Sequence, residues 1–265
     1  MPEKYFTVDG VATHLVHTGA TTLPDVPPDT ARGATLVCLH GSGGNAGTFA
    51  PLLERLAADH SPLAFDQPGH ARSGGLDSLG SVERMAAFTR ALVEKLALRQ
   101  PVLLGHSLGG AVALEYALTW PEGLRGLVLV GSGARFPDLP DDFLDEIRRV
   151  CEGRARRRFD RSAYSPATPD ELVQRGWMED AKTDPRVVHG DLLAVRAWDA
   201  EARLPALATP TLVVVGEDEY PPLRAAAERF PAERTVVVPR AGHMAHFEQP
   251  DAVAEAVRAF LAELA

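Results

Sequence analysis

A serine flanked by glycines is the residue best placed to do chemistry in this chain. The pentapeptide Gly105–Gly109 reads Gly-His-Ser-Leu-Gly and lies between an apolar run, residues 101–104, and a helix-like run that begins at Gly110. Gly-x-Ser-x-Gly at a strand-to-helix junction is typical of a nucleophile elbow, a turn so tight that it needs glycine on both sides of the serine. The turn holds the hydroxyl at a helix N-terminus, where backbone N–H groups favour a developing anion. Ser107 is therefore the candidate nucleophile.

A histidine and an acidic turn further along the chain could activate this serine. His243 follows the last predicted strand, and a neutral imidazole near pH 7 is suited to take the serine proton. Residues 217–219 read Glu-Asp-Glu after another predicted strand, and one carboxylate there could orient the imidazole. Asp218 and Glu219 both remain candidates. His246 lies three residues after His243, but no Cys or carboxylate cluster with zinc-like spacing is near, so no metal site is expected.

A glycine-rich segment after an apolar strand supplies the remaining element. Residues 40–44 read His-Gly-Ser-Gly-Gly, and an oxyanion needs two backbone N–H donors. We expect one donor from Leu108, directly after the candidate nucleophile, and the other from Ser42 or, as the alternative, Gly43. The segment lacks the Gly-Lys-Ser/Thr ending of a phosphate-binding loop, so nucleotide binding is not expected. No organic cofactor is expected either.

Alternating strands and helices must position these segments. We predict strands over residues 5–8, 12–16, 34–39, 62–65, 101–104, 124–130, 211–215 and 234–238, and helices over 49–58, 82–98, 110–118, 223–230 and 251–264. This alternation predicts an α/β fold, with a mostly parallel sheet flanked by helices. Active sites of such sheets lie at the carboxyl ends of the strands, which is where the candidate residues fall.

One segment breaks the alternation. Residues 134–204 read as mainly helical, and we expect them to form a cap inserted into a core domain made of 1–133 and 205–265. Trp177, Met178 and Trp198 lie in this segment and could line an acyl pocket, although packing of the cap against the core is the alternative for each.

Composition narrows the class of protein. The chain has 265 residues, a formal net charge of −9 and 45% hydrophobic residues, which suits a soluble protein and argues against nucleic acid or an anionic membrane as the main partner. Cys38 and Cys151 are too few for a disulfide framework, which favours a reduced, cytoplasmic location. The first residues form no apolar signal core, and no apolar run reaches the roughly 18 residues that span a bilayer. The oligomeric state stays open, with a homodimer among the options.

Taken together, the segments resemble the α/β-hydrolase superfamily. The matching segments occur in the superfamily's order and are His40–Gly44, Asp66–Ser73, Gly105–Gly109, Gly216–Pro221 and Gly242–His243. More narrowly, the chain is similar to the branch of small esterases, enol-lactonases and carbon–carbon-bond hydrolases. The resemblance implies an eight-stranded sheet, the cap after the sixth strand, and a catalytic triad in the order serine, acid, histidine.

Two positions depart from the superfamily pattern. Relatives usually have glycine where this chain has Ala71, in the loop after Asp66. Relatives usually place an aspartate three residues after the glycine that ends the strand, whereas here that position is Glu219 and Asp218 comes one residue earlier.

The expected function is that of a serine hydrolase, which would cleave a small-molecule carboxylic ester or lactone through an acyl-enzyme on Ser107. Two alternatives stay open. One is a lyase or perhydrolase-type reaction on the same triad, and the other is a ligand-binding protein with a weakly active triad.

Overall fold

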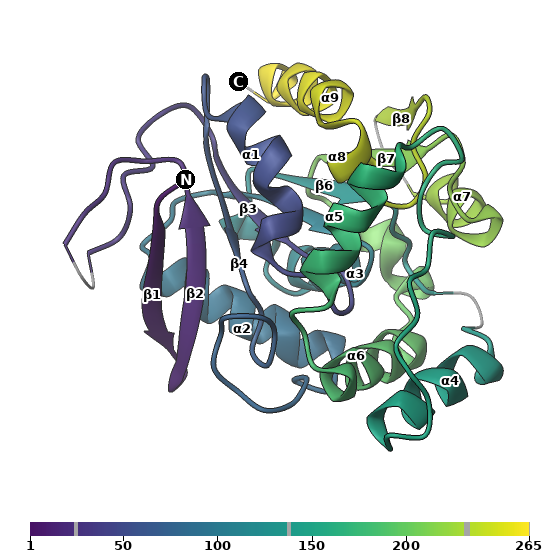
Figure 1. Ribbon diagram of the computed structural model, residues 1–265. Coiled ribbons are helices and arrows are strands. Elements are labelled where there is room, and N and C mark those ends of the chain that lie inside the picture. Colours follow the sequence, from purple (N-terminus) through teal and green to yellow (C-terminus); the bar gives the residue numbers. More distant parts are fainter. Residues whose placement is uncertain (24–25, 137–138, 231–233, 265) are drawn as a thin grey trace.

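The computed structural model describes residues 1–23, 26–136, 139–230 and 234–264 (Figure 1). Its strands form one sheet in the order β1-β2-β4-β3-β5-β6-β7-β8. The strands are β1 (Glu3–Val8), β2 (Val11–His17), β3 (Thr35–Leu39), β4 (Ser61–Phe65), β5 (Val102–His106), β6 (Gly126–Val130), β7 (Thr211–Gly216) and β8 (Arg234–Val238).

The sheet is mixed, and most of it is parallel. β2 runs antiparallel to both of its neighbours, β1 and β4, and every later pair from β4 to β8 is parallel. Asp9 and Gly10 join β1 to β2 with positive φ at both positions, which matches the right-handed twist of a tight hairpin. These pairings confirm the predicted eight-stranded, mostly parallel sheet.

Helices cover both faces of the sheet. In chain order they are α1 (Ala50–Leu56), α2 (Val82–Lys95), α3 (Leu108–Thr119), α4 (Asp141–Cys151), α5 (Asp170–Asp180), α6 (Pro185–Ala197), α7 (Pro221–Ala227), α8 (Ala245–Glu248) and α9 (Pro250–Glu263), with short 3₁₀ turns η1 (Ala46–Phe49), η2 (Pro121–Gly123) and η3 (Glu201–Ala206). Figure 1 shows α1 and α9 together on one face, and α2 and α3 pack on the other.

Alternation along the buried strands divides the interior into two cores. Val37 and Leu39 of β3 point toward α2 and α3, whereas Leu36 and Cys38 point toward α1 and α9. The same alternation holds in β5, β6 and β7. Because both faces are covered, the strands have the near-continuous apolar character of a parallel sheet. Because β3 to β8 run parallel to one another, their carboxyl ends lie at the same edge of the sheet.

The segment between β6 and β7 is mainly helical, as predicted. It contains α4, α5, α6 and η3, and we call residues 134–204 the cap segment. Within it, α6 contacts α3 of the core, and α5 contacts η1. The division into two domains stays a prediction. No helix in the described ranges has both the length and the apolar character needed to cross a membrane.

Candidate active site

Ser107 lies at the junction between β5 and α3. Its backbone has φ 53° and ψ −121°, a left-handed conformation that is strained for a residue with a side chain. A Cβ on Gly105 would lie 2.2 Å from the carbonyl oxygen of Gly109, and one on Gly109 would lie 2.2 Å from that of Leu39. These distances leave no room for a side chain at either position. The pentapeptide therefore forms the predicted elbow.

The neighbouring strand β6 holds the elbow in place. The backbone N–H of Ser107 donates to the carbonyl of Val130 over 3.0 Å, and the hydroxyl of Ser132 donates to the carbonyl of Ser107 over 2.9 Å. A residue keeps a strained backbone conformation only where its surroundings hold it there, and these two hydrogen bonds hold the backbone of Ser107.

His243 and Glu219 form a hydrogen-bonded pair beside the elbow. Nδ1 of His243 is 2.9 Å from Oε1 of Glu219, whose side chain is fully buried. The same oxygen accepts the N–H of Tyr220 over 2.9 Å. The histidine side chain remains 12% exposed. With Nδ1 donating to a carboxylate, the lone pair of the neutral ring is on Nε2, the nitrogen free to act as a base.

The other two acids of this turn point elsewhere. Oδ2 of Asp218 accepts the hydroxyl of Ser165 over 2.6 Å, and Oε2 of Glu217 accepts the N–H of Arg240 over 3.0 Å. Both residues are exposed, whereas Glu219 is buried. Of the two candidates for the acid, Glu219 is the one that contacts the imidazole.

Two observations place His243 near the serine. The ring of His106, the residue before Ser107, lies 4.7 Å from the ring of His243, and its Nε2–H donates to the His243 carbonyl over 3.0 Å. A Cβ on Gly131 would lie 3.0 Å from Nδ1 of His243, and Gly131 directly follows the residue that accepts the N–H of Ser107. Serine and histidine thus flank the end of β6.

Buried, uncharged histidines surround this centre. His246 packs between Phe49 and His106, and burial lowers its pKa to about 3. Burial and the neighbouring imidazoles hold the pKa of His106 well below its ordinary value. Both ring nitrogens of His246 lack a hydrogen-bond partner among the described residues. Its place is between aromatic rings. The described residues contain no group of three or more side chains arranged to hold a metal ion.

The loop after β3 approaches the serine closely. A Cβ on Gly41 would lie 3.1 Å from the Cβ of Ser107. The N–H of Gly43 is directed at the carboxylate of Asp191, 3.4 Å away, while no contact of the described residues occupies the N–H of Ser42. Leu108 is the first residue of α3, where N–H groups have no partner within the helix. Ser42 and Leu108 are thus two N–H donors near the serine that have no hydrogen-bond partner among the described residues.

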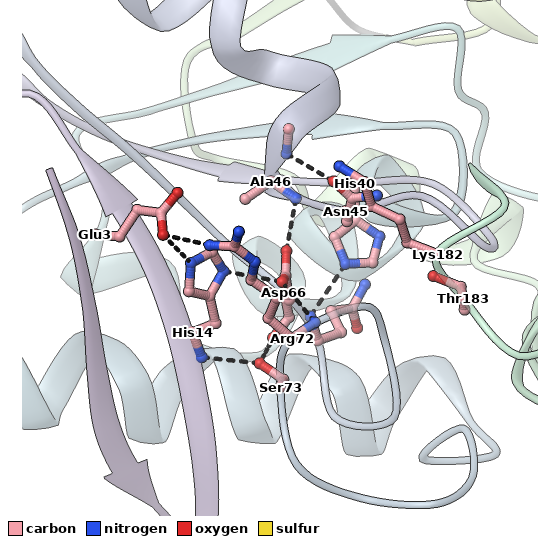
Figure 2. Close-up of polar contacts among 12 residues, drawn as sticks. Glu3, His14, His40, Asn45, Ala46, Asp66, Arg72, Ser73, Lys182 and Thr183 are labelled. Atoms are coloured by element: carbon pink, nitrogen blue, oxygen red, sulfur yellow. Dashed lines mark hydrogen bonds and ion pairs between the residues drawn. The ribbon is translucent and has the colours of Figure 1, made fainter. Parts of the chain in front are cut away.

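A second cluster, around Asp66, supports this loop (Figure 2). Asp66 accepts the N–H of Ala46 at the start of η1, the N–H of Arg72 and Nδ1–H of His14. Burial alone would raise the pKa of Asp66, but hydrogen bonds from His14 and Ala46 hold it below its ordinary value. In Figure 2 the carboxylate lies between β2 and the loop that carries His40. The cluster ties β2, the start of η1 and the loop after β4 together.

The three cap residues predicted to line a pocket have other contacts. Trp198 is 4% exposed, packs in the core and donates from Nε1 to Glu115 over 2.8 Å. Trp177 donates to the carbonyl of Arg158 and stacks edge-on with Phe159. Met178 is exposed. Cap packing accounts for the contacts of both tryptophans. A pocket-lining role for these residues stays a prediction.

Asp191 and His70 are the site-adjacent residues that sequence reasoning missed. Asp191 is in the cap segment, His70 is in the loop after β4, and they form a buried pair next to Gly43. They are 121 residues apart, and no local motif links them.

The fold and this geometry can now be set beside known proteins. A model of the alpha/beta hydrolase family matches residues 36–256. The chain is 30% identical over 247 residues to a pimeloyl-[acyl-carrier protein] methyl ester esterase of Pectobacterium carotovorum, covering 87% of this chain and 95% of that one. It is 27% identical to a 2-hydroxy-6-oxo-6-phenylhexa-2,4-dienoate hydrolase of Burkholderia cepacia, covering 88% and 90%.

Solved structures agree with the sequence relatives. A thermophilic esterase from Thermogutta terrifontis superposes with a TM-score of 0.81 at 26% identity, covering 100% of this chain and 99% of that chain. With the family model spanning most of the sequence, this chain belongs to the alpha/beta hydrolase family, in the branch of its small esterases.

Proposed function

We propose that this protein is a serine hydrolase that cleaves a small carboxylic ester or lactone through an acyl-enzyme on Ser107. The observation that carries the proposal is the hydrogen bond between Glu219 and His243 beside the strained elbow. A buried carboxylate on Nδ1 fixes the tautomer that a general base requires and stabilises the imidazolium that forms during the reaction.

The first half of the reaction forms the acyl-enzyme. Nε2 of His243 takes the hydroxyl proton of Ser107 while the oxygen of Ser107 bonds to the substrate's carbonyl carbon. The tetrahedral oxyanion receives hydrogen bonds from the N–H groups of Ser42 and Leu108. Collapse of this intermediate breaks the bond to the alkoxy oxygen, which takes the proton from His243. In a lactone, that oxygen stays attached to the acyl group.

The second half releases the acid. His243 removes a proton from water as the water oxygen attacks the acyl carbon, and the same two amides hold the second oxyanion. The Ser107 oxygen then leaves with the proton from His243. The products are a carboxylic acid and an alcohol, or a hydroxy acid from a lactone.

The relatives support ester chemistry in general terms. One is named as a methyl ester esterase, and the similar solved structure is described as an esterase. The substrate of this chain is proposed only as a class, a small carboxylic ester or lactone.

Hydrolysis of p-nitrophenyl butyrate and γ-butyrolactone in ¹⁸O-labelled water tests the proposal. Wild type should release acid with one ¹⁸O per turnover, because water opens the acyl-enzyme. Ser107→Ala should lose at least about 10³-fold in kcat, whereas Ser78→Ala, a change in a loop before α2, should retain wild-type kcat.

Three outcomes would contradict this proposal. Unchanged turnover by Ser107→Ala would exclude that serine as the nucleophile. Cleavage without ¹⁸O uptake would favour a lyase or a transfer to another acceptor. Tight ligand binding without turnover by folded wild type would favour a binding protein.

A further inference from the structure

A carboxylate from the cap segment reaches the loop that supplies the oxyanion donor. Asp191 lies in the middle of α6 and is fully buried. Its Oδ2 is 2.8 Å from Nε2 of His70 and 3.4 Å from the N–H of Gly43. Two other residues of the cap segment touch the same loop. The Thr183 hydroxyl donates to the Gly44 carbonyl over 3.4 Å, and Val188 occupies the space beside Gly43.

The geometry around His70, the partner of Asp191, favours a positively charged ring. Nδ1 of His70 is 3.2 Å from the carbonyl oxygen of Pro68, and its Nε2 faces Asp191, so both ring nitrogens point at acceptors. An imidazole needs both protons to satisfy two acceptors, and a ring with both protons is an imidazolium. Burial alone would lower the pKa of His70, but the hydrogen bond and charge of Asp191 hold it above its ordinary value.

A neutral histidine, His40, holds the preceding peptide of the loop, between Gly41 and Ser42. The ring of His40 packs against that of His70, with centroids 4.6 Å apart and ring planes tilted by 53°. Nε2 of His40 accepts the N–H of Gln67 over 3.0 Å, so its proton is on Nδ1, which donates to the Gly41 carbonyl over 2.9 Å. Burial, with the neighbouring imidazole of His70, lowers the pKa of His40 to about 4, consistent with this neutral form.

These contacts fix two consecutive peptide planes. The Gly41 carbonyl is held by His40 and by the N–H of Gly44 at 3.0 Å. In a trans peptide the next N–H points the opposite way from the carbonyl, so the N–H of Ser42 points away from His40. The carboxylate of Asp191 accepts the N–H of Gly43 over 3.4 Å, which holds the second plane and favours Ser42 over Gly43 as the oxyanion donor.

We propose that Asp191, held in place by His70, is a positioning residue that orients the Ser42 N–H for the oxyanion, so that a docked cap segment is part of the catalytic apparatus. This inference rests on the proposed function, because it concerns the same oxyanion. Asp191 touches no reacting atom and acts through the loop of residues 41–44. Its loss should therefore weaken stabilisation of the transition state more than binding of the substrate.

Steady-state hydrolysis of p-nitrophenyl butyrate by Asp191→Ala tests the proposal, with folding checked by circular dichroism. We expect kcat to fall by about 10- to 100-fold and KM to stay within about threefold, since one oxyanion donor is displaced rather than deleted. Asp191→Asn keeps an oxygen that can accept the N–H of Gly43, so it should restore part of kcat. Affinity for an alkyl trifluoromethyl ketone, which forms an oxyanion on serine, should fall with kcat.

Asp184→Ala is the matched control. Asp184 caps the N-terminus of the same helix by accepting the N–H of Arg186, and it has no contact with the loop among the described residues. The control should lose helix stability and keep kcat within about twofold. Removing Asp191 alone leaves a buried cation, which can prevent folding. The double variant His70→Gln/Asp191→Ala removes that cation together with its partner and should still show the low kcat.

The outcomes separate the two claims. Wild-type kcat in a folded Asp191→Ala or in the folded double variant would overturn the positioning role. A raised KM with unchanged kcat would also overturn it, because Asp191 would then bind substrate. Absence of turnover by wild type would instead overturn the proposed function itself.

Discussion

Oε1 of Glu219 lies 2.9 Å from Nδ1 of His243, although an aspartate stands one residue earlier in the chain. The turn after β7 leaves the side chains of Glu217 and Asp218 exposed and buries that of Glu219. A glutamate is one methylene longer than an aspartate, and here it reaches the imidazole from the buried position. The local backbone, rather than the residue type, selects the acid.

Replacing this acid should impair catalysis far more than replacing its neighbour. In Glu219→Gln the amide can donate to Nδ1, which favours the wrong tautomer of His243, so kcat should fall by about 10³- to 10⁴-fold with little change in KM. Asp218→Asn removes only the charge of a carboxylate that accepts a hydrogen bond from Ser165, so kcat should fall by less than about threefold. Steady-state kinetics of the two variants decide the matter. A larger loss in Asp218→Asn would contradict the assignment.

The space beside this pair can be tested through Gly131. A Cβ there would lie 2.8 Å from Oε2 of Glu219 and 3.0 Å from Nδ1 of His243, and the backbone has φ 54°. Gly131→Ala should therefore displace the pair and lower kcat by at least about tenfold, as small misplacements do in active sites.

Gly153→Ala separates the steric effect from backbone strain. Gly153 has φ 71°, and a Cβ there would meet nothing within 4 Å. Both variants should lose about 1 kcal/mol of stability or more, because alanine is strained at positive φ. Only Gly131→Ala should lose activity, which thermal unfolding beside kinetics would reveal. An equal loss of kcat in both would mean that strain alone affects the site.

Local sequence patterns predict most of the fold because its signals are short-range. The apolar runs predict the strands, and the glycines around Ser107 predict its place between a strand and a helix. Ends of elements were less accurate. The helix predicted over 82–98 ends at Lys95. After it, Ala97 and Gln100 have left-handed backbone conformations, which alanine and glutamine do not predict.

Contacts across the chain were beyond this reasoning. Asp191 is 148 residues from Gly43, and no sequence motif around either residue predicts their contact. The sequence makes Trp198 a candidate for the pocket or for cap packing, and it gives no sign that the indole N–H donates to Glu115, 83 residues away. Which carboxylate faces His243 depended on the path of one turn, and the pattern of the sequence left that choice open.

Buried neutral histidines should make the protein sensitive to acid. The pKa of His246 is lowered to about 3, whereas the unfolded chain takes up this proton near pH 6.5. The unfolded state therefore binds more protons between these values, and the free energy of unfolding should fall as pH drops below about 6.5, by up to about 1.4 kcal/mol per pH unit for this group. His40, with a pKa of about 4, adds to the slope.

Urea unfolding at several pH values checks this expectation. His246→Leu removes the group that must take up a proton, so its stability should depend less steeply on pH between about 6.5 and 4.5. It should also match or exceed wild type at pH 7, because the ring nitrogens of His246 have no partner among the described residues. A slope equal to that of wild type would show that His246 is not the buried neutral group described above.

The most direct test of the whole account is the intact mass of the protein after reaction with a fluorophosphonate. This reagent labels a serine only when a base and an oxyanion site activate it. We predict one adduct per chain, located on Ser107 by peptide mapping, with none on Ser107→Ala and much slower labelling of Glu219→Gln. No adduct on folded wild type, or an adduct on another serine, would contradict the account.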